Sequence, residues 1–282
     1  MSVALAAFLA ILLGAVVETI VLRLIVNMLL ESGAVRKNYL DHNIPVSGGI
    51  SFPISLLLVF LFFILISRYD AGLDTYLIGI IAISFLGFID DMLGQRDTLG
   101  FKGHFGALFK GKLTTGGLKA LGGGLVAFFL ALSLMVEEPG SSWGEIILNT
   151  FIIALFTNML NLLDLRPGRA LKGYLFFLII IVIMAAGQVN WLLITSLLGI
   201  VIAYFPLDLK ARVMMGDAGS NVLGLSLGYF SVLFLSLPCR IGILLFLIAI
   251  HIYTEKFSLT RTIERVPWLR VIDQLGRSNE NG

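Results

Sequence analysis

Nine apolar segments, each close to the length of a membrane span, constrain this sequence more than any other feature. A helix needs about 20 predominantly apolar residues to cross a bilayer. Only 13% of the residues are charged, whereas a soluble domain carries about 25%. The sequence therefore predicts an all-α polytopic membrane bundle over residues 1–258, followed by a basic tail over residues 259–282. The predicted spans cover residues 3–30, 48–67, 74–90, 116–136, 146–163, 173–187, 190–206, 219–237 and 240–256.

The basic residues are distributed unequally between the two sets of connecting segments. All Lys and Arg residues except Arg23, Arg68 and Arg240 fall in segments that share a side with the tail. Because cytoplasmic loops are enriched in Lys and Arg, we expect the N-terminus outside and the C-terminus in the cytoplasm. The single Cys239 excludes an internal disulfide framework. No basic stretch is interleaved with aromatic residues, which argues against a nucleic-acid partner.

Polar residues gather on the side predicted to be cytoplasmic. Asp90 and Asp91 follow an uncharged apolar run that extends from Tyr76 to Ile89. A carboxylate near hydrocarbon is costly, so such a pair is by default a hypothesis for a functional site. The alternative is that the two acids end a helix and face water. The one-sided distribution favours an enzyme over a transporter, whose polar groups are expected near the midplane.

A second polar group lies at the end of the fifth predicted span. Asn158, Asn161 and Asp164 recur every three residues, so they lie along one face of a helix. Two amides and a carboxylate suit a hard cation or a sugar phosphate. Hydrogen bonds between neighbouring helices are the alternative role for the amides.

A third group surrounds Asp217, which stands between Gly216 and Gly219 where a loop meets a helix. Glycine lets the backbone approach a ligand closely, and a helix N-terminus favours phosphate oxygens. Mg²⁺ prefers one or two carboxylates together with substrate phosphates. The alternative is that Asp217 is a helix N-cap.

Basic residues on the same side form a candidate phosphate-binding surface. The enrichment of cytoplasmic loops in Lys and Arg explains most of them without a ligand. We single out Lys112 and Lys119, which flank a Thr-Gly-Gly stretch; Arg166, Arg169 and Lys172 lie in the next loop on that side.

The ordered set of motifs resembles the polyprenyl-phosphate N-acetylhexosamine-1-phosphate transferases. That family includes phospho-MurNAc-pentapeptide translocase and the enzymes that prime O-antigen and teichoic-acid synthesis. The resemblance covers about residues 30–260. The motifs that carry it are Pro45-Val46-Ser47-Gly48-Gly49, Asp90-Asp91, Asn158 to Asp164, and Gly216-Asp217-Ala218-Gly219-Ser220.

The resemblance implies transfer of a sugar-1-phosphate from a UDP-sugar to undecaprenyl phosphate or another polyprenyl phosphate, with release of UMP. The reaction would use Mg²⁺, or Mn²⁺ in its place, at the cytoplasmic face of a bacterial inner membrane, for cell-envelope glycan synthesis. Asp217 would bind the metal, and Asp90 would deprotonate the lipid phosphate with Asp91 beside it. Asn161 and Asp164 would hold the nucleotide or the sugar, and Asp164 is counted with Asp90 and Asp91 as a candidate catalytic acid. The other candidate substrate-binding residues are Asn158, Lys112, Lys119 and Arg166.

The sequence also departs from the family pattern. Leu165-Arg166-Pro167-Gly168 follows Asp164 where the family usually continues with Gly, and Leu207 replaces a family Asn, with Asp208 beside it. Residues 266–277 take the place of a His-rich loop, and no tenth span follows. These differences favour a changed sugar donor. Two other classes stay open: a regulatory paralogue that binds polyprenyl phosphate or a nucleotide sugar, and the disfavoured transporter. The sequence leaves the oligomeric state open, a homodimer included.

Overall fold

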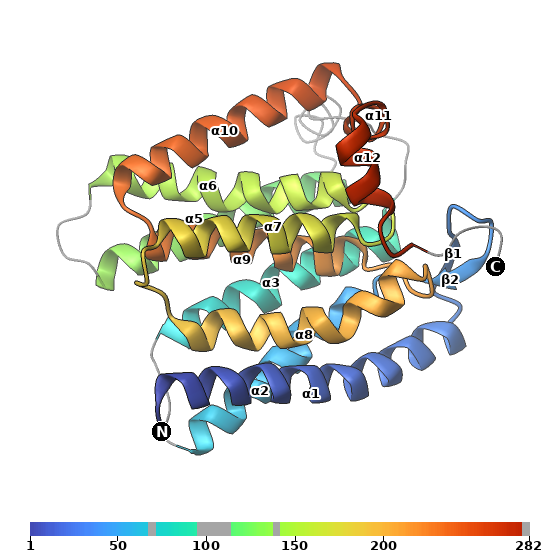
Figure 1. Ribbon diagram of the computed structural model, residues 1–282, viewed down its shortest axis with the longest axis horizontal. Coiled ribbons are helices and arrows are strands. Elements are labelled where there is room, and N and C mark those ends of the chain that lie inside the picture. Colours follow the sequence, from blue (N-terminus) through green and yellow to red (C-terminus); the bar gives the residue numbers. More distant parts are fainter. Residues whose placement is uncertain (67–71, 95–113, 138–141, 278–282) are drawn as a thin grey trace.

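The computed structural model describes residues 1–66, 72–94, 114–137 and 142–277, which form a bundle of long helices (Figure 1). Every one of the nine predicted spans contains a helix. The bounds are α1 (Val3–Glu31), α2 (Ser51–Leu65), α3 (Gly72–Leu93), α5 (Thr115–Glu137), α6 (Trp143–Leu163), α7 (Arg169–Met184), α8 (Trp191–Leu209), α9 (Gly216–Phe234) and α10 (Leu237–Lys256).

Within the described residues, seven of these segments are long and apolar enough to cross a membrane, by length and composition. The other two are α7, which has 16 residues, and α9, in which Ala218–Val232 are all buried. Helix α9 packs against α3, α6 and α7 at the centre of the bundle, so its neighbours shield it from lipid. The prediction of an all-α polytopic membrane bundle is confirmed.

Small residues let the central helices approach closely. A Cβ on Gly224 of α9 would lie 2.5 Å from the carbonyl oxygen of Phe156 in α6, and one on Gly228 would lie 2.5 Å from the Cα of Ile153. The same holds between α1 and α8, where a Cβ on Gly199 would lie 2.2 Å from the carbonyl oxygen of Ile11. Membrane helices associate through such close packing because lipid supplies no hydrophobic driving force between them.

A buried carboxylate fastens α1 to the start of α2. Ser51 and Ser55 each donate to the Glu18 carboxylate at 2.6 Å, and the Ser51 Oγ also lies 2.9 Å from the Gly48 carbonyl oxygen. Gly48 begins the short 3-10 helix η1 (Gly48–Ile50). An antiparallel hairpin of β1 (Val35–Lys37) and β2 (Asn43–Pro45) precedes η1.

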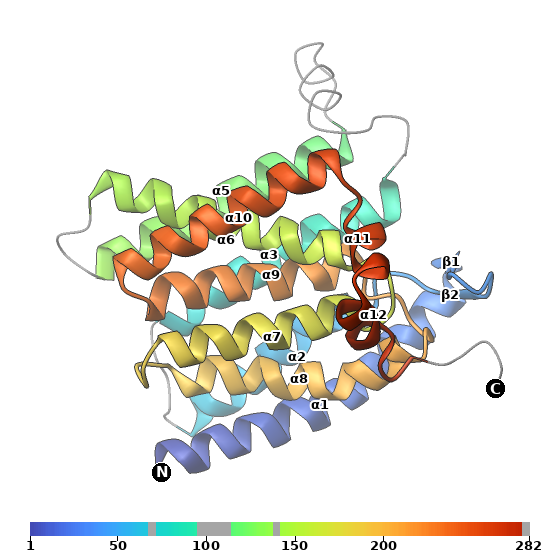
Figure 2. The ribbon, with the colours of Figure 1, turned by 45° about the horizontal axis from the view of Figure 1, so that its top comes forward.

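Figures 1 and 2 show this hairpin at one end of the bundle and the N-terminus at the other. We call the first the hairpin end. The acidic ends of α3 and α6 and the start of α9 lie there. Two short helices, α11 (Leu259–Arg265) and α12 (Pro267–Gln274), lie across the same end, and they form the described part of the predicted tail.

Candidate active site

Three charged side chains from three helices meet at the hairpin end. The Lys119 Nζ, near the start of α5, lies 3.3 Å from Asp90 Oδ2 at the end of α3, and it also donates to Asp217 Oδ2 at the start of α9. The Asp90 and Asp217 carboxylates lie close to each other, and the Thr115 hydroxyl contacts Asp90. Two carboxylates this close repel unless a cation or a proton stands between them, and Lys119 supplies the cation.

Asp91 faces a different set of partners, all of them donors. It accepts from the Ser47 hydroxyl at 2.6 Å and from the backbone N–H groups of Asp217 at 3.1 Å and Ala218 at 3.3 Å. Its backbone carbonyl accepts from the Arg36 guanidinium. Asp91 thus satisfies N–H groups of the first turn of α9, where a negative charge also stabilises the helix dipole. It holds the backbone that carries Asp217.

The turn into α9 depends on glycine. Gly216 has φ of 70°, a region that favours glycine. An added Cβ there would lie 2.4 Å from Asp91 Oδ2. Asp217 lies in the first turn of α9 rather than at the N-cap, which is Met215. The N-cap alternative for Asp217 is therefore wrong, and its carboxylate faces Lys119 and Asp90 instead.

Asp164 joins this site from the end of α6. Its carboxylate lies beside the backbone N–H of Gly216. Burial, together with the nearby carboxylates of Asp208, Asp217 and Asp91, raises the pKa of Asp164 well above its ordinary value. Asp164 therefore belongs to the same cluster of acids as Asp91 and Asp217.

The other predicted residues lie around this centre. Asn158 and Asn161 are half-buried on the last turns of α6. The hydrogen bonds found among the described residues include none from either amide side chain. The guanidinium of Arg166 lies 5.8 Å from the centre of the Tyr39 ring in the hairpin. Lys112 lies outside the described residues.

Some polar residues of the site were not singled out from the sequence. Ser47, which binds Asp91, belongs to a quoted motif but received no role. Asp208, noted only as a neighbour of Leu207, accepts the backbone N–H of Gly168 at 2.7 Å and so holds the turn after Asp164. In the sequence, only its position beside Leu207, which replaces a family Asn, pointed to Asp208.

The carboxylates are compatible with a divalent cation but do not form a closed metal cage. Over the ranges that the structure describes, no group of three or more His, Cys, Asp or Glu residues could hold a metal ion. Mg²⁺ is commonly bound by one or two carboxylates plus substrate phosphates. Asp90 and Asp217 offer such a pair, and the Lys119 ammonium between them shows that the position attracts positive charge.

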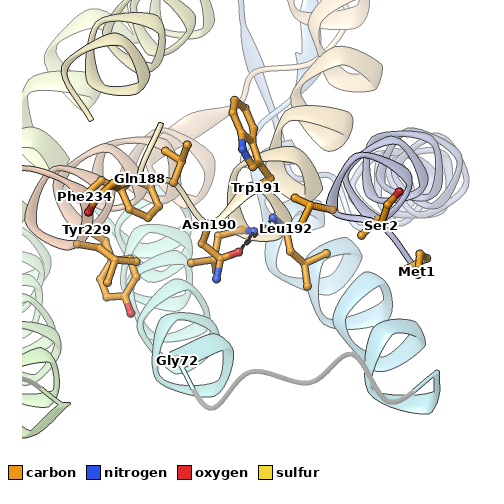
Figure 3. Close-up of a pocket in the computed structure, with 14 residues that line it drawn as sticks. Met1, Ser2, Gly72, Gln188, Asn190, Trp191, Leu192, Tyr229 and Phe234 are labelled. Atoms are coloured by element: carbon orange, nitrogen blue, oxygen red, sulfur yellow. Dashed lines mark hydrogen bonds between the residues drawn. The ribbon is translucent and has the colours of Figure 1, made fainter. Parts of the chain in front are cut away.

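A hollow at the opposite end of the bundle does not belong to this site. It has a volume of about 690 Å³ and lies between the starts of α1 and α8, near Ser2, Asn190 and Trp191 (Figure 3). None of the predicted site residues lines it.

The fold and the site together define a polytopic helical membrane protein with a cluster of acids and one lysine at one end of its bundle. The family model described as glycosyl transferase family 4 matches residues 73–235, more than half of the chain. The chain belongs to this family, which comprises polyprenyl-phosphate sugar-1-phosphate transferases. No curated protein matches the chain.

Proposed function

We propose that the protein transfers a sugar-1-phosphate, an N-acetylhexosamine-1-phosphate, from a UDP-sugar to undecaprenyl phosphate or another polyprenyl phosphate. UMP is released, and the product primes a cell-envelope glycan. The site faces the cytoplasm from a bacterial inner membrane. The observation that carries the proposal is the group of Asp90, Lys119 and Asp217 at one end of the bundle. Such a site can receive a phosphate on a lipid and a phosphate from solution together.

The reaction is a displacement at phosphorus. An oxygen of the lipid phosphate attacks the phosphorus that bears the sugar, and a new P–O bond forms. The P–O bond to UMP breaks, and UMP leaves with the electron pair. Asp90 accepts the proton of the lipid phosphate, which is general-base catalysis. Catalysis then depends on alignment and on stabilising the charge of the pyrophosphate.

The remaining side chains bind and orient the substrates. Lys119 contacts phosphate oxygens after exchanging its carboxylate partners for them. Asp164 and Asn161, at the end of α6, hold the nucleotide or the sugar by hydrogen bonds. Asp217 would hold Mg²⁺, which supplies charge neutralisation on the pyrophosphate when bound.

One observation favours a second candidate, a regulatory paralogue that binds polyprenyl phosphate or a nucleotide sugar without turnover. Lys119 already neutralises both Asp90 and Asp217, so the pair is satisfied without a metal. In an enzyme, substrate phosphates must draw this ammonium away. In a binding protein, it stays.

UMP release separates the two candidates. Purified full-length protein is incubated with a panel of UDP-N-acetylhexosamines, polyprenyl phosphate and Mg²⁺. We expect UMP release that requires the lipid phosphate. Asp217→Asn should abolish it, because the substitution keeps the shape and removes the charge. Asp41→Asn is the matched control, since Asp41 is an exposed acid of the hairpin whose partner is Lys37. Failure on every donor, in protein that still binds polyprenyl phosphate, would favour the regulatory candidate.

A further inference from the structure

Helix α12 presents an apolar face with no protein partner among the residues described. Trp268, Val271 and Ile272 in α12 and Leu275 at its C-cap are 65%, 65%, 51% and 70% exposed. Their spacing of three, four and seven residues places them on one side of a helix. A contiguous apolar strip of this kind marks an interaction surface rather than scattered exposed residues.

The opposite face of α12 is fixed to the bundle. Asp273 is buried and accepts from the Arg169 guanidinium at 2.8 and 3.0 Å and from Arg277 at 2.6 Å. Although burial opposes it, these two guanidinium groups lower the pKa of Asp273 below its ordinary value. Paired, fork-shaped contacts of this type fix geometry. These contacts therefore fix the orientation of α12, and with it the orientation of the apolar face.

Lysine contacts cap the end of the same helix. The Lys172 Nζ donates to the carbonyl oxygens of Ile272, Asp273 and Leu275 at 2.7–2.9 Å. These are the carbonyl groups that a helix leaves unpaired at its C-terminus. Arg277 also donates to the carbonyl oxygen of Pro167 at 2.8 Å, so the helix is tied to the turn that follows Asp164.

The position of α12 indicates what covers its apolar face. The membrane-spanning segment α10 ends at Lys256, and only residues 257–266, seven of them in α11, separate it from α12. Figures 1 and 2 show α11 and α12 lying across the hairpin end, where α10 ends. A chain this short keeps α12 near the level at which α10 leaves the hydrocarbon. Among the exposed charged residues of α11 and α12, Arg261, Arg265 and Arg270 outnumber Glu264, so the surroundings carry net positive charge.

We propose that α12 is an interfacial helix whose apolar face inserts into the boundary between acyl chains and headgroups of an anionic bilayer. An amphipathic helix with a basic surround and a Trp on its apolar face is suited to this location, and Trp is enriched at membrane interfaces. Because Asp273 and Arg277 tie α12 to Arg169 and Pro167, the bilayer contact holds the turn that carries Asp164. This inference does not depend on the transferase reaction.

Depth-dependent quenching of Trp268 fluorescence tests the proposal. The chain contains three Trp residues, so Trp143→Phe with Trp191→Phe leaves Trp268 as the only one. The full-length variant is placed in nanodiscs of anionic lipid that carry bromine near the top of the acyl chain. We expect the fluorescence to fall at least twofold relative to unbrominated lipid, and acrylamide in the water to quench weakly.

A matched pair of substitutions defines the face. Val271→Glu puts a charge on the apolar face and should reduce bromine quenching at least twofold. Gln274→Glu adds the same charge on α12 outside that face and should leave quenching unchanged. Strong acrylamide quenching without bromine quenching would mean that water covers the face. Protection from both quenchers would mean that protein covers it, for example a second copy of the chain. Either result would overturn the proposal.

Discussion

The contact between α3 and the first turn of α9 is tested by adding one methyl group at Gly87. Gly87 lies one turn before Asp90 and Asp91 on α3. An added Cβ would lie 2.4 Å from the carbonyl carbon and oxygen of Asp217 and 2.6 Å from the nitrogen of Ala218. All of these atoms are backbone, so no flexible side chain can move aside. Gly87→Ala must displace the start of α9.

The size of the displacement sets the expected loss. Ordinary van der Waals contact begins at 3.4 Å, so Asp217 must move by about 1 Å, and a misplacement of about 1 Å costs about 100-fold in rate. Overpacking of this kind costs about 1–3 kcal/mol of stability. We therefore expect Gly87→Ala to fold but to release UMP about 100-fold more slowly than the wild type.

Gly124→Ala is the matched control, because nothing lies within 4 Å of its added Cβ. Replacing a helical Gly by Ala in open space stabilises a helix by up to about 1 kcal/mol. Initial rates of UMP release and the thermal midpoint in detergent are measured for both variants. If Gly87→Ala matched Gly124→Ala in rate, the close approach of α3 to the Asp217 turn would be wrong.

Three other substitutions or fusions test separate parts of the account. Lys119→Met leaves Asp90 and Asp217 without their cation, so turnover should fall at least 100-fold. The thermal midpoint should also drop, because breaking a largely buried ion pair costs about 3–5 kcal/mol. Unchanged turnover would refute the pairing. Asp273→Asn removes the charge that holds α12, so limited trypsin digestion should cut the tail several-fold faster, and an unchanged rate would contradict the clamp. A reporter fused after Gly282 should be cytoplasmic, and a periplasmic signal would reverse the predicted orientation.

The spanning helices could be predicted because hydrophobicity is a local property of the chain. Their ends depend on tertiary contacts. The sixth predicted span begins at residue 173, but α7 begins at Arg169. Gly168, with φ of 73°, forms the turn before it, and the carboxylate of Asp208 accepts the Gly168 N–H. A local sequence pattern cannot predict the contact between Gly168 and Asp208, which are 40 positions apart.

Part of the candidate site could be predicted from the sequence, since Asp90, Lys119 and Asp217 were named and the structure brings them together. Their contacts could not be predicted. Successive residues on a helix point about 100° apart, so Asp90 and Asp91 meet different partners. Asp90 faces Lys119 and Asp217, whereas Asp91 binds Ser47 and the start of α9. The sequence predicts only that the tail lies on the same side as the segments rich in Lys and Arg. The pairing of Asp273 with Arg169 joins residues 104 positions apart and emerges only in the folded chain.

The most direct test of the central claim follows the phosphate that bears the sugar. A UDP-N-acetylhexosamine radiolabelled at that phosphate is incubated with the purified protein, polyprenyl phosphate and Mg²⁺, and the lipid is extracted. If the protein transfers a sugar-1-phosphate, the label moves into the lipid in step with UMP release, and Asp217→Asn leaves it in the donor. Transfer of the sugar without the labelled phosphate, which would release UDP, would contradict the account.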